Sequence, residues 1–410
     1  MVSVRFATKG VLVALVLFCL CGRVWASQTH REKNRGWEQS LEHKGITAGL
    51  SYIGDVFGDV SGGSRRGSGY LHMVSGSVHI DLARLMGVTG GVVYVSGFWT
   101  LGDNPSEFIG DAQGVDNIAA PNTAKIFNAQ YRQSLFNRRL RLMLGLYDVN
   151  SEFQVSERSN LFLNASFGIG PTFSESGVNG PSVFPTTAPA VRIEGDPSST
   201  LTFRVVAANG IAGDPADPYG THVIFGGGAM LAAELEHHAP GSDDRKLALG
   251  SWVYTALTPG IEQGDFGRPV SRSQRSYGFY ALGDYPVWQD ASGKREVGIF
   301  GRIGHASPGA NRIAWFVCGG VTLEGSLLFG EDDNIGVGFV TAFNGSGYKD
   351  AMDRLGAPVE NAETTFEITG QFGVCRQVSV QPDIQYVINP NTDPAIGNAV
   401  ATFLRLNVQL

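Results

Sequence analysis

The chain contains little cysteine and no long apolar run beyond its amino terminus. Of the four cysteines in its 410 residues, Cys19 and Cys21 fall in the first segment, and only Cys318 and Cys375 remain after it. Two cysteines are too few for the disulfide framework of a small secreted domain. After residue 26, no apolar stretch approaches the roughly 20 residues that a transmembrane helix needs.

Positive charge and catalytic motifs are scarce as well. Lys and Arg number 31 against 38 Asp and Glu, for a formal charge of −7, which excludes a generally basic nucleic-acid-binding protein. The sequence has no G-x-S-x-G elbow, no H-E-x-x-H pair and no P-loop, and its eight histidines do not cluster at ligand spacing. We therefore predict no enzymatic activity, no cofactor and no metal site. A carboxylate pair distant in sequence remains the one enzymatic alternative.

The amino terminus has the pattern of a secretory signal peptide. A basic start precedes an apolar run over residues 10–20, and small residues at Val24 and Ala26 mark a cleavage site. Cleavage of residues 1–26 removes three basic residues and no acidic one, so the formal charge becomes −10. The polar residues 27–44 are expected to form an N-terminal extension. Export without a spanning helix is compatible with a soluble secreted protein and with an outer-membrane β-barrel.

From residue 45 onward, apolar and polar residues alternate. In the segment 139–147, leucines alternate with Arg139, Arg141, Met143 and Gly145. The same period is seen in residues 46–52, 201–208, 222–236 and 404–410. This alternation places one face of a strand in an apolar medium and the other in a polar one. About sixteen such segments follow one another, at an average of 24 residues each, which suits bilayer-crossing strands of about 9–11 residues with their connections.

Two architectures fit this alternation. A soluble antiparallel sandwich would turn one face to a core and the other to water. A membrane barrel would turn the apolar face to lipid and the polar face to a wet lumen. Arg and Glu near the middle of the polar faces, and apolar faces free of charge, favour the barrel. We therefore predict an all-β fold, a single transmembrane antiparallel barrel of about sixteen strands over residues 45–410.

The predicted connections differ in length. Tight turns are expected at Asn137-Arg138 and Asp196-Pro197-Ser198, and between them lies a stretch of about 40 residues, 148–188. Other long connections are expected near 100–124 and 343–361. Tight turns at one end and long loops at the other are typical of outer-membrane barrels.

Several strings lie at wide spacing along the chain after the leader: residues 52–63 (YIGDVFGDVSGG), 81–91, 141–148 (RLMLGLYD), 161–168 (LFLNASFG) and 381–390 (QPDIQYVINP). In order and spacing they resemble the carbohydrate-selective porin (OprB) family of Gram-negative outer membranes, and together they cover nearly the whole of that part of the chain. The resemblance implies a sixteen-stranded barrel that passes monosaccharides such as glucose by diffusion, with a third loop, here about 148–188, that folds inward and narrows the lumen.

The chain departs from the family pattern at two positions. Asp59 stands where the family commonly has Asn before the V-S-G-G string. The chain ends in Leu410, whereas outer-membrane barrels usually end in an aromatic residue. The final alternating strand is otherwise intact, so we interpret the ending as a tolerated variant.

Charged residues at the strand positions that alternate with the lipid-facing ones are predicted to face the lumen, and they are the candidate pore constriction. A sugar pore needs charged and amide groups to replace water on the hydroxyls, and its binding must be weak. The candidates share either this parity or a place at the end of a family-like motif: Arg139, Arg141, Arg192, Glu194, Arg204, Asp55 and Asp148. Alternatively, the same charges only solvate the lumen and pair in a structural ladder.

Three functions remain open on the sequence alone. The first is a sugar-preferring diffusion porin of a Gram-negative outer membrane, with neutral sugars as permeants, outer-membrane lipid as its surroundings and no nucleic acid partner. The second, motivated by the same arginines, is a general or anion-preferring porin. The third is a secreted soluble β protein, a lectin or a hydrolase. The sequence is compatible with a monomer or a homotrimer.

Overall fold

The structure is a computed structural model. It describes residues 41–410 except 240–241, 262–272, 326–329 and 331–332. The predicted signal peptide, 1–26, and most of the predicted extension, 27–44, lie outside the described residues.

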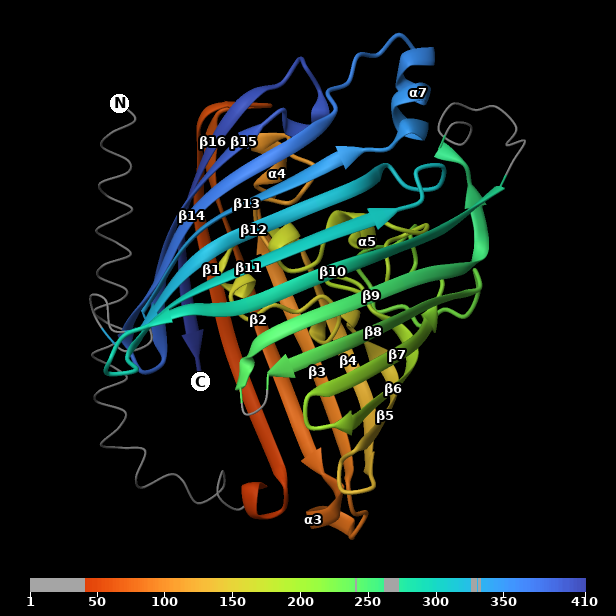
Figure 1. Cartoon of the computed structure of the whole chain (residues 1–410), viewed down its shortest axis with the longest axis vertical. Coiled ribbons are helices and arrows are strands. Elements are labelled where there is room, and N and C mark those ends of the chain that lie inside the picture. The colour runs from red at the N-terminus through yellow and green to blue at the C-terminus, as the bar shows by residue number, and fades with distance from the viewer. Residues whose placement is uncertain (1–40, 240–241, 262–272, 326–329, 331–332) are drawn as a thin grey trace.

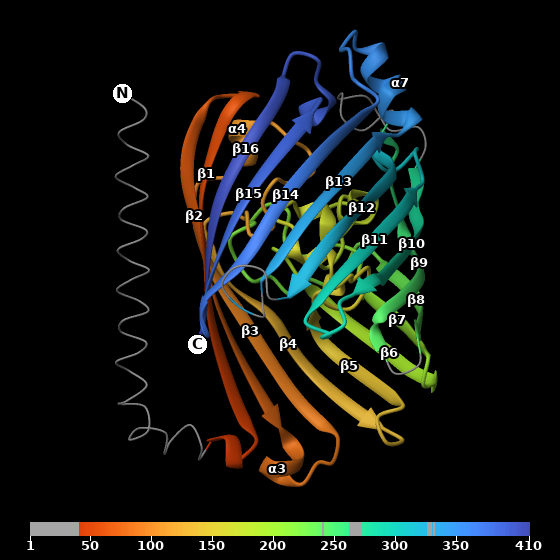
Figure 2. The ribbon, with the colours of Figure 1, turned by 60° about the vertical axis from the view of Figure 1, so that its left-hand side comes forward.

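Sixteen antiparallel strands in the described part of the chain close into one barrel, in which each strand pairs with its neighbours in sequence (Figures 1 and 2). The strands are β1 (Ile46–Gly63), β2 (Gly67–Asp81), β3 (Gly91–Gly102), β4 (Thr123–Leu135), β5 (Leu140–Tyr147), β6 (Ala188–Ser198), β7 (Leu201–Asn209), β8 (Ala229–Ala239), β9 (Ser242–Pro259), β10 (Ser273–Gln289), β11 (Arg295–Ala306), β12 (Ile313–Gly325), β13 (Asn334–Asn344), β14 (Ala362–Cys375), β15 (Val378–Ile388) and β16 (Gly397–Gln409).

The first and last strands close the barrel. Residue Phe57 of β1 is opposite Phe403 of β16, and Asp55 is opposite Arg405. Closure pairs the edge of every strand with a neighbour. A strand in hydrocarbon requires such pairing, because no water is there to form hydrogen bonds with unpaired backbone groups. Among the described residues, the structure contains no helix with the length and apolarity to cross a membrane.

The two faces of the wall differ as the alternation predicts. Leu144, Val191 and Leu249 point outward and are 50–60% exposed. Their sequence neighbours Met143 and Arg192 point inward and are buried. An apolar outer surface around a polar interior is the reverse of a soluble protein and suits lipid outside and water inside. The predicted barrel is confirmed, and the soluble sandwich is not the fold.

Two predicted strand starts were wrong. Strand β8 begins at Ala229, whereas residues 222–228 belong to the preceding connection, where Gly227 and Gly228 have φ of +67° and +76°. Strand β5 begins at Leu140, because Phe136, Asn137 and Arg138 all adopt positive φ in the turn before it. A tight turn with positive φ cannot continue the extended backbone of a strand.

The short helices lie in the connections between strands. They are α3 (Leu82–Met86), α4 (Ser106–Ile109), η1 (Val149–Ser151), η2 (Ser159–Leu161), η3 (Ala165–Phe167), α5 (Pro171–Ser174), α7 (Ser346–Arg354) and η4 (Pro390–Thr392). Four of them, η1 to α5, belong to the long connection 148–187 between β5 and β6, here called the inserted loop. Figures 1 and 2 show it inside the barrel, surrounded by the wall.

Local capping shapes the inserted loop. The carboxylate of Asp148 accepts the backbone N–H of Asn150 at the start of η1, and the side chain of Asn164 accepts that of Ser166 at the start of η3. Such caps satisfy N–H groups that a short helical turn leaves without a backbone acceptor. The loop therefore enters the lumen as a series of single capped turns rather than as one long helix.

Glycines on the inner wall make room for the inserted loop. A Cβ on Gly338 would lie 2.9 Å from the Phe167 ring, and one on Gly336 would lie 2.8 Å from the Phe162 ring. A Cβ on Gly298 would overlap the guanidinium of Arg158. The chain has 55 glycines in 410 residues, and part of this number is thus explained by the close approach of loop to wall.

Candidate functional site

The inserted loop is fastened to the far wall by charged groups. The guanidinium of Arg158 donates to Asp284 on β10 and to Glu296 on β11. The backbone N–H groups of Leu163 and Asn164 donate to the carboxylate of Glu367 on β14, at 2.5 and 3.1 Å. Because these contacts join the loop to three separate strands, they fix its position across the lumen.

An aromatic cluster packs residues 162–167 of the inserted loop against the barrel wall. Phe162 and Phe167 stack with ring centroids 4.3 Å apart, and both contact Phe300 of β11. With Phe316 and Cys318 of β12, they form a buried apolar cluster. Solutes therefore have no aqueous route between the loop and this part of the wall.

A second connection also folds inward. Residues 103–122, between β3 and β4, place Asp116 against Arg405 at 3.0 Å, and Arg405 also binds Asp55 at 2.9 Å. Glu363 of β14 accepts the backbone N–H groups of Ala112 and Gln113. The sequence predicted a long connection here but not its inward path, because its contacts are with residues more than 250 positions away.

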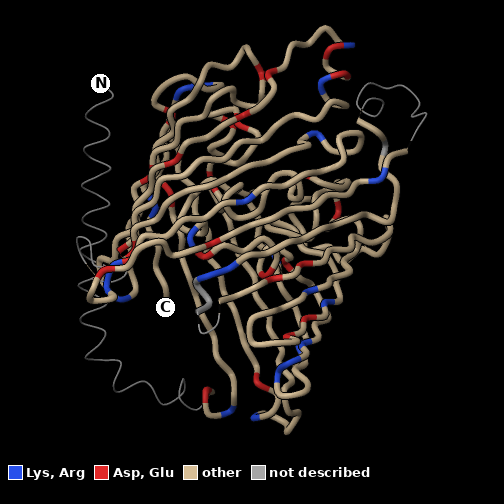
Figure 3. Tube along the Cα trace, viewed as in Figure 1, with Lys and Arg blue, Asp and Glu red and all other residues tan. Residues whose placement is uncertain are grey.

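Four predicted site residues come together on neighbouring strands. Glu194 on β6 forms ion pairs with Arg141 on β5, Arg192 on β6 and Arg204 on β7. Figure 3 shows basic and acidic residues following one another across this part of the wall. We call this group, with its further partners, the charge ladder. Those partners are Glu152, Asp196, Glu234, Glu236 and Lys246.

The charge ladder is nearly neutral. Its three arginines and one lysine face five carboxylates, so its formal charge is −1. Each arginine binds at least two carboxylates; Arg192, for example, contacts Glu152 of the inserted loop at 2.5 Å. Side chains of Arg141 and Arg204 keep 29% and 15% of their surface exposed, so part of the ladder borders solvent.

The other predicted site residues lie elsewhere. Parity placed Arg139 in the lumen, but it lies in the exposed turn before β5, so this placement was wrong. Asp55 is fully buried on β1, where it holds Arg405 rather than joining the ladder. Glu234 and Glu236 were not among the predicted site residues. Both lie at lumen-facing positions of β8, and Glu234 is directly opposite Arg204.

One open space in the described part of the barrel lies along β1 to β4. A cavity of about 540 Å³ borders this wall and both ends of the inserted loop. Small polar side chains and aromatic rings line it: Ser51, Ser75, Ser77, Ser96, Asn128, Ser151, Tyr94, Phe98, Phe127 and Phe184. We call this cavity the serine-lined passage. Asp148 also borders it and has no ion-pair partner among the described residues.

Asp148 is an acid poised to titrate near neutral pH. Burial raises its pKa to about 7, the N–H of Asn150 opposes that shift, and the nearby Glu152 carboxylate adds to it. As the pH rises through this range the group becomes negative, and as the pH falls through it the charge is lost. Asp148 is thus a titrating charge on the wall of the passage.

Replacing Asp148 with asparagine is expected to reduce the pH dependence of ion selectivity. In the natural chain, cation preference should increase as the pH rises from about 6 to about 8, because the carboxylate ionises. The Asp148→Asn variant should show a lower cation preference and a smaller increase over the same range; the increase need not vanish, because burial also raises the pKa of Glu175 in the inserted loop to about 7. Zero-current potentials across planar bilayers in a salt gradient measure this. Ser151→Asn, a neighbouring change without a charge, should behave like the natural chain.

Comparisons with known proteins agree with this architecture. A family model described as carbohydrate-selective porin, OprB family, matches residues 65–410. The chain is similar to the high-pH structure of Pseudomonas putida OprB, with 18% identity and a TM-score of 0.81 over 92% of this chain and 96% of that chain. No curated protein sequence gives a significant match.

Two further solved structures share the fold. The low-pH structure of Pseudomonas putida OprB matches with 14% identity and a TM-score of 0.56 over 92% of this chain and 96% of that chain. The outer membrane channel DcaP of Acinetobacter baumannii matches with 11% identity and a TM-score of 0.54 over 89% of this chain and 97% of that chain. At these identities the similarity is one of fold.

Proposed function

Because this chain belongs to the carbohydrate-selective porin (OprB) family, we propose that it lets neutral monosaccharides such as glucose diffuse passively through its lumen. A porin is a channel and not an enzyme, and family membership implies an outer-membrane location. We further propose that residues 1–26 direct export of the chain in a Gram-negative cell and are then cleaved off.

The near neutrality of the charge ladder is the observation that carries the proposal. The arginines that motivated an anion-preferring pore are each paired with carboxylates, as Arg204 is with Glu194 and Glu236. A ladder with no net positive charge gives an anion no electrostatic advantage. A neutral polyol can still exchange hydrogen bonds with the exposed edges of Arg141 and Arg204.

The sizes and surfaces of the lumen also suit monosaccharides. Two inward loops reduce the open lumen, and the serine-lined passage combines hydroxyls with aromatic rings. Serine hydroxyls both donate and accept hydrogen bonds, and aromatic faces pack on the apolar face of a sugar ring. We propose Arg141, Arg192, Glu194, Arg204 and Asp148 as lumen-lining residues. Asp55 is proposed to anchor the second inward connection rather than to contact sugar.

Conductance with sugar titration tests this assignment. Glucose added to the bath should reduce the ion current through the protein in planar bilayers, because sugar and ions share one path. The Arg141→Ala variant should require more glucose for the same reduction, because it loses a partly exposed guanidinium of the ladder. Equal titration curves for the two proteins would remove Arg141 from the sugar path.

A further inference from the structure

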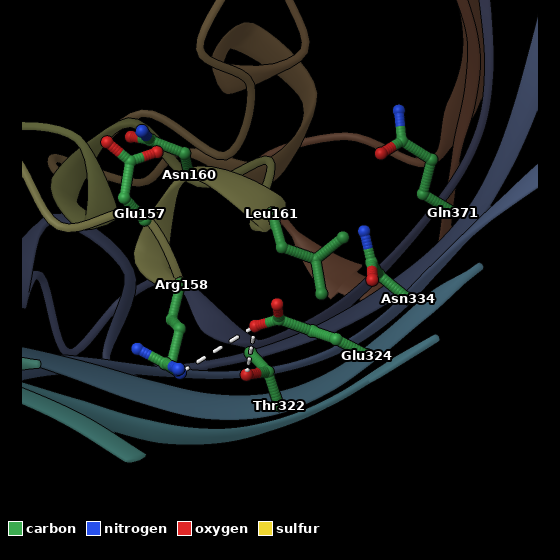
Figure 4. A pocket seen from close by; sticks show the side chains of 8 residues that line it. All are labelled: Glu157, Arg158, Asn160, Leu161, Thr322, Glu324, Asn334 and Gln371. Carbon is green, nitrogen blue, oxygen red and sulfur yellow. Dashed lines mark hydrogen bonds and ion pairs between the residues drawn. The ribbon is translucent and has the colours of Figure 1, made fainter. Parts of the chain in front are cut away.

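A second polar cavity lies beneath the inserted loop, on the wall formed by β12 to β14. Its volume is about 270 Å³, and its lining comes from residues 157–161 of the loop and from the wall strands (Figure 4). Leu161 projects from the loop toward Glu324 and Asn334 on the wall. The cavity is therefore enclosed by two elements that are far apart in sequence.

The cavity lies near the end of the barrel at which β12 ends and β13 begins. Glu324 is next to the last residue of β12, and Asn334 is the first residue of β13. Between β14 and β15, at the same end, only residues 376–377 intervene. Short connections face the periplasm in outer-membrane barrels. The buried cluster that contains Phe162 and Phe167 packs the neighbouring part of the loop against β11, β12 and β13.

Several polar groups in this cavity have no partner within the protein. In the part of the chain that the structure describes, the side chains of Glu157, Asn160 and Asn334 make no hydrogen bond or ion pair to another residue. The charge ladder differs, because each of its arginines and carboxylates binds another ladder residue. The cavity thus offers unused donors and acceptors to a ligand.

Other groups in the cavity are held in fixed positions. The hydroxyl of Thr322 donates to the Glu324 carboxylate at 2.9 Å, and Arg158 Nε lies 3.7 Å from the same carboxylate. The Gln381 amide donates to the Leu161 carbonyl at 2.6 Å. A site whose groups are already positioned loses less entropy when a ligand binds.

We propose that this cavity is a periplasm-facing subsite for one neutral monosaccharide, a role that rests on the proposed sugar-porin function. The Asn334 amide and the Glu324 carboxylate would bind hydroxyls of the sugar, while Leu161, which projects toward both, contacts an apolar ring face. Anionic sugars are disfavoured, because Glu157 and Glu324 outnumber Arg158, which already binds two further carboxylates. Sugar that has crossed the lumen is held briefly at the exit without blocking it.

Saturation-transfer NMR on the detergent-solubilised full chain tests the subsite, with glucose as the probe. For the natural protein we expect two binding components, one from the lumen path and one from the cavity. The double variant Glu324→Ala with Asn334→Ala should weaken one component roughly tenfold, since about 1.4 kcal/mol corresponds to the loss of two such hydrogen bonds. Glucose 6-phosphate should not compete for that component. Asn407→Ala, which removes a wall amide outside the cavity, should leave it unchanged.

Uptake measurements on the same variants separate the two proposals. If liposomes containing the natural protein take up glucose but the double variant binds glucose like the natural protein, the subsite is wrong and the porin function stands. If glucose does not enter those liposomes at all, the proposed function itself fails. Loss of one binding component with uptake retained supports both.

Discussion

Replacing Gly336 and Gly338 with leucine is expected to increase single-channel conductance severalfold. Both glycines lie on the lumen face of β13, and even a single added Cβ would come within 3.0 Å of the Phe162 or Phe167 ring. Whole leucine side chains cannot fit without displacing those rings, and overpacking of this kind costs about 1–3 kcal/mol per site. The inserted loop would leave the wall and reopen part of the lumen.

The neighbouring residue provides a matched control. Val337 lies between the two glycines on the same strand but points outward and is 53% exposed. The Val337→Leu variant adds volume to the lipid face, so its conductance should equal that of the natural chain. Recovery of both variants as heat-modifiable barrels on gels would show that they fold. Unchanged conductance in the folded glycine variant would contradict the role of the loop as the restriction.

Replacing Glu194 with glutamine is expected to shift ion selectivity toward anions. Glu194 is the one ladder carboxylate that contacts three arginines, and its side chain is 8% exposed. The change removes the formal charge of −1 from the ladder and leaves Arg141, Arg192 and Arg204 with fewer acceptors. Removing one partner of a buried ion pair lowers the free energy of unfolding by about 3–5 kcal/mol when the other charge is left unpaired. Each arginine here keeps another carboxylate, so the decrease should be smaller.

Zero-current potentials in a salt gradient measure this shift, and an exposed ion pair supplies the control. Glu107 pairs with Arg65 at the surface, where the two side chains are 65% and 57% exposed. Exposed pairs contribute little, and their field is screened by salt, so Glu107→Gln should leave selectivity unchanged. An unaltered potential in Glu194→Gln would mean that the conducting path does not border the ladder.

The barrel could be predicted from the sequence because alternation is a local signal. The residues of each strand indicate which face meets lipid, as the leucines of β5 do. A closed barrel then follows because a sheet in lipid must leave no strand edge unpaired. The position of the inserted loop was also predictable, because about 40 residues without alternation between two tight turns interrupt the pattern, whereas its inward fold was implied only by the family resemblance. Parity correctly brought Arg141, Arg192, Glu194 and Arg204 to one face.

Features that depend on distant contacts could not be predicted in this way. Parity applies only inside a strand, so it failed at Arg139, where the turn extends one residue further than its Asn-Arg signal indicates. The inward path of residues 103–122 depends on the pairing of Asp116 with Arg405, 289 positions away. The cavity under the inserted loop needs Leu161 of the loop to lie beside Glu324 and Asn334 of the wall, which no local pattern encodes.

Liposome swelling tests the central claim most directly. Liposomes containing the purified chain are diluted into isosmotic glucose, a zwitterionic amino acid of similar size, or glucose 6-phosphate, and the initial swelling rates are compared. We predict that glucose enters fastest and that glucose 6-phosphate enters slowest, because the paired ladder offers anions no net positive charge. Equal rates for all three solutes, or fastest entry of the phosphate, would contradict the assignment of this barrel as a porin selective for neutral sugars.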